Sequence, residues 1–380
     1  MRKKTIGRKE RRIRGKKRGS LAAVSLMSLV LAACGGGASQ TAQPAQTETA
    51  AQESAVQEGE AGADEAGGQE QATEGNIGEG KGVDGQEAAA DTDIATSMED
   101  LAFAPGGKIE SDTFTGNAYI KPMVMNDEIY NFPQTNNIIF EPGARSGWHT
   151  HGGMVIIGTG GTGYYQEEGK PAQIIREGDV IECEAGVKHW HGAAPDSWFS
   201  QIVIYDSHYT APEGAEAEEP VTDEYYEDLE TEDYAGRVVT DDNLFMFQKA
   251  EEPLISDTFS GPAYVSSIIG DDNVADAPGL HYVVFEPGVI NNWHTHEGGQ
   301  ILIATDGIGY HQVEGGEVEV LYPGDVALCP PGVKHWHGGS ADTEFAHIAV
   351  NTNPELTGLE WFDRISEEEY GQLPTEKTEE

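Results

Sequence analysis

The chain has 380 residues, of which 66 are acidic and 23 are basic, and its formal net charge at pH 7 is −43. A surface this acidic repels nucleic acid and anionic lipid, so proteins that bind either of them through charge are excluded. Eleven of the basic residues and one acidic residue lie in residues 1–33, and without that segment the formal charge is −53.

The amino terminus predicts an exported protein that is tethered to a membrane. Residues 2–18 are strongly basic, and residues 21–33 form a mainly apolar run that ends in Leu-Ala-Ala before Cys34. This order is typical of a secretory signal, and the run is too short for a comfortable membrane span. The segment also resembles a bacterial lipobox, whose cysteine receives lipid and becomes the first mature residue. We therefore expect a signal peptide over residues 1–33, lipid on Cys34 and an extracytoplasmic location; ordinary cleavage after Ala33 is the alternative.

The next segment, residues 34–100, is predicted to be a disordered acidic tether. It consists mainly of Ala, Gly, Gln, Glu, Thr and Ser and contains no aromatic residue. Such a composition cannot bury enough apolar surface to offset the entropy lost on ordering. A flexible coil of this length reaches roughly 40–48 Å, so it would act as a spacer above the membrane.

The rest of the chain contains two copies of one sequence unit, over residues 101–236 and 237–371, each large enough for its own core. The ends of the copies also look related, because residues 224–229 and 360–365 both combine acidic and aromatic side chains. Residues 372–380 are predicted to be an acidic tail. The clearest matches are Trp148-His-Thr-His with Trp293-His-Thr-His, and Gly186-Val-Lys-His-Trp-His-Gly with Gly332-Val-Lys-His-Trp-His-Gly.

Each copy is predicted to be all-β. Short β-rich segments such as residues 155–157 and 301–304 alternate with Gly- and Pro-containing turns, which favours a closed antiparallel barrel or a jelly roll. A capping box, Ser366-Glu-Glu-Glu, predicts one short helix near the end of the chain. Cys183 and Cys329 occupy matching positions in separate copies, so we expect two small buried residues and no disulfide between them.

Three histidines and a glutamine in the second copy have the spacing of a metal site. His294 and His296 lie two residues apart, so on an extended strand their imidazoles point to the same face. Gln300 follows after two glycines, whose conformational freedom can bring its amide oxygen back toward the imidazoles. His335 offers a third imidazole. Imidazole nitrogens with one oxygen suit a divalent metal such as Zn, Fe or Mn.

These motifs resemble those of the cupin family, which combine Gly, five residues and His-x-His with Gln, and later Gly, five residues, Pro-x-Gly and His. The resemblance implies a double-stranded β-helix, or jelly-roll barrel, for each copy. The chain is then expected to be a bicupin, with two tandem barrels that pack on each other after the signal peptide and the linker. A divalent metal is also implied, with Mn first and Fe, Zn or Ni as alternatives. The matching residues are Gly288, His294, His296, Gln300, Gly324, Pro330, Gly332 and His335.

The first copy retains three of the four ligands. His149, His151 and His189 match the histidines of the second copy, but aligning the copies requires one deletion in the first. That deletion places Met154 at the position of Gln300. Three imidazoles can hold a metal, so a working metal site and a degenerate copy kept for packing are both open.

Each copy has a further histidine, His191 or His337, two residues after the last ligand and therefore expected in the same barrel interior. The spelling of both motifs resembles a subgroup of small cupins that includes manganese-dependent hydroxynitrile lyases and carboxymuconolactone-decarboxylase-associated cupins. This resemblance places His337 near the substrate. We predict that His337, and His191 in the first copy, are catalytic proton carriers; a structural histidine bonded to the backbone is the alternative.

Two classes of function are open. An enzyme would polarise a carbonyl or hydroxyl oxygen at the metal while a histidine moves a proton, which suits a lyase, decarboxylase or isomerase acting on a small hydroxy or keto compound. A non-catalytic surface lipoprotein would instead capture a small molecule or a metal for a transporter or sensor. An iron-dependent oxygenase is a third, weaker option. The ligand set favours the enzyme, whereas export favours the binding protein.

Overall fold

The computed structural model describes residues 95–125, 134–206, 208–210, 218–237, 245–270 and 273–375. The predicted signal peptide, Cys34, the tether up to residue 94 and the last five residues lie outside these ranges. In the described part of the chain, no helix is long and apolar enough to cross a membrane. The first half begins earlier than residue 101, because Ala95 bridges to Trp198 and a 3-10 helix, η1, spans Met98–Asp100.

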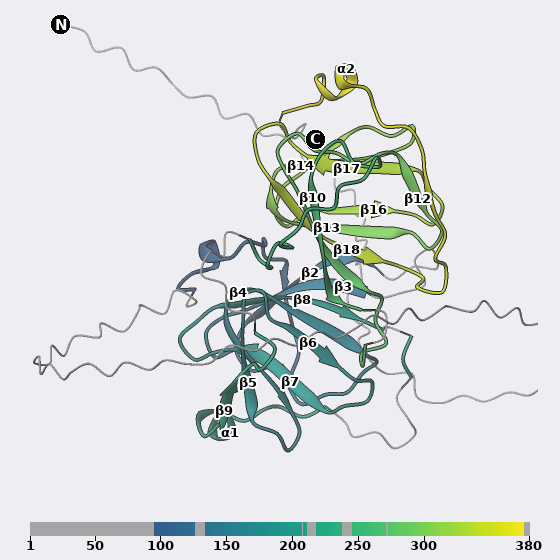
Figure 1. The fold of residues 1–380 in the computed structure, drawn as a ribbon. Helices are drawn as coiled ribbons and strands as arrows, with labels where there is room; N and C mark the ends of the chain where they lie inside the picture. Colours follow the sequence, from purple (N-terminus) through teal and green to yellow (C-terminus); the bar gives the residue numbers. More distant parts are fainter. Residues whose placement is uncertain are drawn as a thin grey trace, which may run out of the picture. The chain divides into compact units, whose positions relative to one another are not determined.

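The first half is a nine-stranded antiparallel sheet, with one parallel edge strand, that curves into a barrel (Figure 1). Its long strand β4 belongs to both layers of the barrel: residues 154–161 pair with β6 and β8, and residues 162–167 pair with β5 and β7. The strands are β1 (Gly107–Lys108), β2 (Ala118–Val124), β3 (Gln134–Phe140), β4 (Met154–Glu167), β5 (Ala172–Arg176), β6 (Val180–Cys183), β7 (His189–Ala193), β8 (Phe199–Tyr205) and β9 (Thr231–Asp233).

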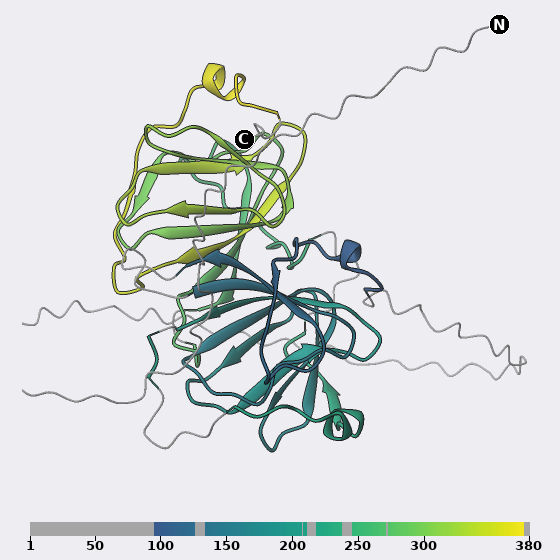
Figure 2. The same cartoon turned by 180° about the vertical axis from the view of Figure 1, so that it is seen from behind.

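The second half repeats this plan as two five-stranded sheets, because two strands, β13 and β14, replace the single strand β4. One sheet has the order β10-β11-β18-β13-β16 and the other β15-β14-β17-β12-β19. Figure 2 shows the strands of this half, in green and yellow, from behind. The strands are β10 (Ala263–Ile269), β11 (Leu280–Phe285), β12 (His294–His296), β13 (Gln300–Gly307), β14 (Gly309–Val313), β15 (Glu319–Leu321), β16 (Val326–Cys329), β17 (His335–Gly339), β18 (Phe345–Asn351) and β19 (Leu359–Trp361).

The predicted all-β class with two jelly-roll barrels is therefore confirmed. Among the described residues, α-helix is limited to α1 (Asp223–Glu227) and α2 (Glu367–Tyr370). The side chain of Ser366 caps α2 by accepting from the backbone N–H of Glu369, while the Glu369 carboxylate accepts from Ser366 in return. This is the predicted capping box.

The predicted match between residues 224–229 and 360–365 is wrong. The Tyr226 hydroxyl donates to the carbonyl oxygen of Ala193 at the end of β7, and the Tyr370 hydroxyl donates to that of Gly339 at the end of β17. These two carbonyls occupy equivalent strand positions, so α1 corresponds to α2. Residues 224–229 and 360–365 look alike in the sequence because both are acidic and aromatic. The structural equivalence of α1 and α2 depends instead on the contact that Tyr226 or Tyr370 makes on the outside of its barrel.

One buried hydrophobic cluster contains side chains of both halves, including Val155 and Ile202 of the first and Leu280 and Ile348 of the second. These residues are almost completely shielded from solvent. Burial of large aliphatic side chains contributes roughly 1.5–3 kcal/mol each, so the two barrels stabilise each other.

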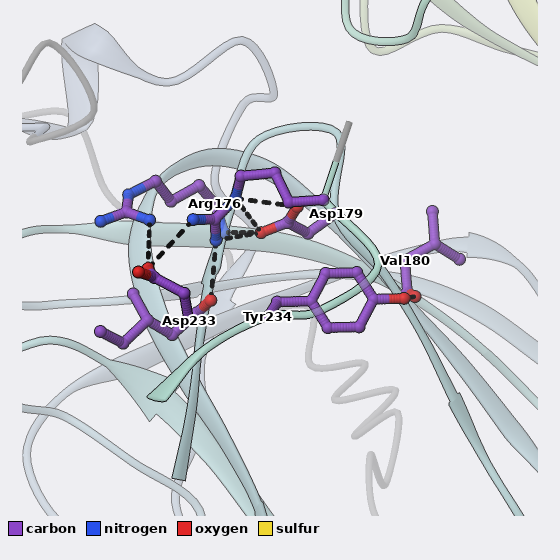
Figure 3. Close-up of polar contacts among 7 residues, drawn as sticks. Arg176, Asp179, Val180, Asp233 and Tyr234 are labelled. Carbon is purple, nitrogen blue, oxygen red and sulfur yellow. Dashed lines mark hydrogen bonds and ion pairs between the residues drawn. The ribbon is translucent and has the colours of Figure 1, made fainter. Parts of the chain in front are cut away.

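An ion-pair network fastens the last segment of the first barrel (Figure 3). The Arg237 guanidinium contacts the buried carboxylate of Asp179 at 2.5 Å and that of Asp233 at 3.3 Å, and Arg176 also reaches Asp233 at 3.3 Å. The neighbouring Tyr234 hydroxyl donates to the carbonyl oxygen of Val180. These contacts hold the segment after β9 against the barrel before the chain continues to the second half.

Candidate functional site

The ligand candidates of the second barrel come from the ends of three strands, two in one sheet and one in the other. His294 on β12 pairs directly with His335, the first residue of β17. Gln300 begins β13 after a turn in which Gly299 has a φ of 85°. That left-handed conformation favours glycine, and a Cβ atom at residue 299 would also lie 2.9 Å from the carbonyl oxygen of Cys329. The tight turn needed to return Gln300 to the imidazoles therefore depends on glycine.

Gln300 and His335 direct two hydrogen-bond acceptors at each other. His335 Nδ1 lies 3.0 Å from the carbonyl oxygen of Val333, so this nitrogen carries the proton and Nε2 keeps its lone pair. The Gln300 amide nitrogen donates to Asn351 Oδ1 at 3.1 Å, which turns Gln300 Oε1 toward His335 Nε2 at 3.4 Å. Two buried lone pairs at this separation repel each other unless a cation or a proton lies between them. The geometry is that of a cation site.

Protonation does not resolve this contact, because the imidazoles are poor proton acceptors. Burial, reinforced by neighbouring histidines, lowers the pKa of His335 to about 2. Burial likewise lowers the pKa of His294 to about 3 and that of His296 to about 4. All three imidazoles are neutral at pH 7, which is the form that binds a metal. The donor set of neutral nitrogens and one amide oxygen fits a divalent metal ion.

The histidines that lie closest together are not the predicted trio. Ligand nitrogens of His294, His335 and His337 all lie within 4.8 Å of one another. The ring centroid of His296 is 5.1 Å from that of His294 and 5.7 Å from that of His335, and its nitrogens fall outside the tight group. Two sets of three imidazoles thus share His294 and His335, with His296 as the third member in one and His337 in the other.

His337 is held by Asn291. The Asn291 side chain accepts from the backbone N–H of His337 at 2.9 Å, which fixes its amide nitrogen 3.0 Å from His337 Nε2. Nε2 must therefore accept, and the proton of the neutral ring is on Nδ1. Within the described residues, this buried Nδ1 has no hydrogen-bond partner. His337 consequently presents a donor to the barrel interior, and its lone pair is already used.

His347 is a functional candidate that the sequence motifs do not include. It lies on β18, with its ring centroid 4.9 Å from that of His337, and it packs against Phe285 and Phe345. Burial lowers its pKa to about 3. Neither of its ring nitrogens finds a hydrogen-bond partner among the described residues, although the side chain is fully buried. In the sequence, His347 stands out only when the two copies are aligned, because the first copy has Gln201 at the equivalent position.

Cys329 and Cys183 are buried free thiols, as predicted. Cys329 is nevertheless not a purely apolar residue, because its Sγ lies 3.1 Å from Nε2 of His311. The other nitrogen of that ring lies 2.5 Å from the carboxylate of Glu319. Burial raises the pKa of the Cys329 thiol, so the thiol donates to the imidazole. His311 is a second buried histidine that the motifs do not contain.

The first barrel brings its three predicted ligands together. The nitrogens of His149, His151 and His189 lie within 4.8 Å of one another. Strand register also confirms the predicted deletion, because Met154 pairs with Cys183 as Gln300 pairs with Cys329.

Comparison with known proteins identifies the family. A sequence profile described as "Cupin domain" matches residues 281–350. An (R)-mandelonitrile lyase of Granulicella tundricola is 38% identical over 115 residues, which make up 30% of this chain and 87% of that relative. The chain belongs to the cupin family. With two barrels, it is a bicupin.

The bicupin is also similar to two solved structures. A cupin-like protein of Thermotoga maritima is 40% identical and matches 34% of this chain and 98% of its own, with a TM-score of 0.32. An oxalate decarboxylase of Lactobacillus farciminis, solved as a formate complex, is 15% identical and matches 71% of this chain and 94% of its own, with a TM-score of 0.44.

The two barrels of this bicupin differ around the histidine on β7 or β17. In the first barrel, the side-chain amide nitrogen of Gln201 lies 2.8 Å from Nδ1 of His191. In the second barrel, His347 takes the place of Gln201 and leaves the corresponding nitrogen of His337 unpartnered among the described residues. The unpartnered nitrogens of His337 and His347 therefore lie on neighbouring rings in the interior of the second barrel, where a polar ligand would satisfy them.

Proposed function

We propose that the second barrel is the active site of a metal-dependent lyase that acts on a small hydroxy or keto compound. The observation that carries this proposal is the pair of acceptors, Gln300 Oε1 and His335 Nε2, placed beside the unpartnered nitrogens of His337 and His347. A cation would satisfy the first pair and a polar substrate the second. The similarity to an (R)-mandelonitrile lyase supports cleavage next to a hydroxyl-bearing carbon.

We assign the metal to His294, His296, His335 and Gln300, because the lone pair of His337 already accepts from Asn291. We favour Mn over Fe, Zn or Ni because one ligand is a hard amide oxygen. The bound ion would act as a Lewis acid that acidifies a hydroxyl or polarises a carbonyl oxygen.

His337 and His347 would then have different roles in proton transfer. His337 donates from Nδ1 and orients the substrate oxygen, because Asn291 occupies its lone pair. His347 keeps one lone pair free, but burial holds its pKa near 3 and makes it a weak base. It would therefore accept the hydroxyl proton only from a substrate whose hydroxyl a metal had made more acidic. As the proton leaves, the oxygen electrons form the carbonyl, the adjacent carbon–carbon bond breaks, and the leaving carbanion takes the proton back from His347. The surrounding phenylalanines exclude water from this step.

The test is an assay of metal-free and metal-loaded full-length protein on mandelonitrile, aliphatic cyanohydrins, α-hydroxy acids and keto acids. We expect aldehyde or ketone release only after loading with a divalent metal, and none from a His335→Ala variant treated in the same way. His149→Ala is the matched control in the first barrel and should retain the activity. Tight metal binding without turnover of any of these compounds would contradict a lyase and favour the non-catalytic binding protein.

We also propose that the protein is anchored to a bacterial membrane through lipid on Cys34, with the acidic segment as its spacer. The Leu-Ala-Ala-Cys sequence after a short apolar run supports this. Metabolic labelling with a fatty-acid probe should mark the wild type, mark Cys183→Ala equally, and leave Cys34→Ala unlabelled. Equal labelling of the Cys34→Ala variant would contradict the anchor.

A further inference from the structure

The three histidines of the first barrel are prepared to bind a metal. Their Nδ1 atoms each lie close to a backbone carbonyl oxygen: His149 to Gly147 at 2.7 Å, His151 to Gly152 at 2.5 Å and His189 to Val187 at 2.9 Å. These contacts place the ring protons on Nδ1 and leave the Nε2 lone pairs available. The Nε2 of His189 is buried and, among the described residues, has no hydrogen-bond partner.

The residue at the fourth ligand position differs between the two barrels. Met154 occupies the place of Gln300, is 2% exposed, and packs inside the barrel with Cys183 and Tyr165. The residue that orients the glutamine has changed as well, because Tyr205 pairs with Met154 where Asn351 pairs with Gln300.

The hydroxyl of Tyr205 donates to Gln134 Oε1 at 2.7 Å, so this tyrosine is engaged elsewhere. The first barrel therefore lacks both the amide oxygen and the asparagine that orients it in the second barrel, and it has a thioether at the ligand position. A soft thioether favours a soft ion, whereas the amide oxygen of the second barrel favours a harder one.

The ligands of both barrels are uncharged, so the fourth position is what distinguishes the two sites. The first barrel has a thioether there and the second an amide oxygen. Thioether ligands select Cu(I) among the biological metals.

We propose that the first barrel is a monovalent copper site, with the three imidazoles and the thioether of Met154 as ligands. This proposal does not depend on the lyase proposal, which concerns the second barrel. The bicupin would then hold two different metals, a soft monovalent ion in the first barrel and a harder divalent ion in the second.

The test uses the full chain and Cu(I) in competition with a chromophoric Cu(I) chelator. We expect one tightly held Cu(I) per chain, and X-ray absorption at the copper edge should show nitrogen and sulfur scatterers. Met154→Leu, which conserves volume, should weaken Cu(I) binding by about tenfold or more and remove the sulfur signal. Cys183→Ala is the control for the other nearby sulfur and should keep both the affinity and the signal.

The reciprocal change adds a readout in the second barrel. Met154→Gln should reduce the preference of the first barrel for Cu(I) over Mn(II), whereas Gln300→Met should increase it in the second. Copper bound without a sulfur scatterer, or with equal affinity in Met154→Leu, would overturn the proposal. If Met154→Leu does not fold, the presence or absence of sulfur scattering in the Cys183→Ala protein decides the question.

Discussion

His294→Ala is expected to remove the divalent metal from the second barrel, whereas His149→Ala should leave that ion in place. His294 belongs to both possible imidazole sets, and its backbone pairing with His335 makes it central to either. Loss of one of four ligands leaves Gln300 Oε1 and His335 Nε2 unable to complete a coordination shell. The measurement is Mn(II) per chain after loading and gel filtration, determined by elemental analysis. Loss of the ion from His149→Ala alone would contradict our ranking of the two barrels.

A second pair of variants decides which histidine completes the shell. If His296 is the ligand, as the motif predicts, His296→Ala should lose the metal and His337→Ala should retain it. If the tight group in the structure is the coordinating one, the result is reversed. Asn291→Ala separates position from coordination, because it removes the hydrogen bond that holds the His337 ring without changing any proposed ligand. Retention of metal by both single variants would mean that neither imidazole coordinates.

The motifs predicted the parts of the site that depend on local spacing. The return of Gln300 after two glycines follows from residues adjacent in the sequence, and so does the placement of Met154 at the equivalent position. His347, His311 and Asn351 could not be found in this way. They reach the interior through strands β14 and β18, whose neighbours in the barrel are set by long-range pairing.

The role of His337 in proton transfer also depends on contacts that the sequence does not show. Alternation along β17 correctly predicts that His335 and His337 share the interior face while Trp336 faces outward, where its indole N–H donates to Gln312. The sequence does not show that Asn291, which lies 46 residues earlier, already occupies the lone pair of His337. An imidazole whose hydrogen-bond partners are unknown cannot be assigned as a base or as a donor. The predicted role of His337 as proton acceptor therefore gives way to our proposal that it donates and that His347 accepts.

His347→Gln is expected to reduce lyase turnover by about 10²–10⁴-fold while the Mn(II) content stays unchanged, because removal of a general base typically has an effect of that size. Glutamine is the residue found at this position in the first barrel, where its amide contacts the equivalent histidine, so the variant copies an arrangement that the fold already accommodates. The amide has no basic lone pair, yet it can still satisfy the Nδ1 atom of His337 through its oxygen.

Thermal unfolding and metal analysis of the same preparation provide the controls for the His347→Gln variant. Because burial keeps the pKa of His347 near 3, the wild-type residue is neutral across the neutral pH range, and raising the pH from 6 to 8 should not restore activity to the variant. Turnover close to that of the wild type in His347→Gln, with full metal content, would show that the proton is accepted by another group.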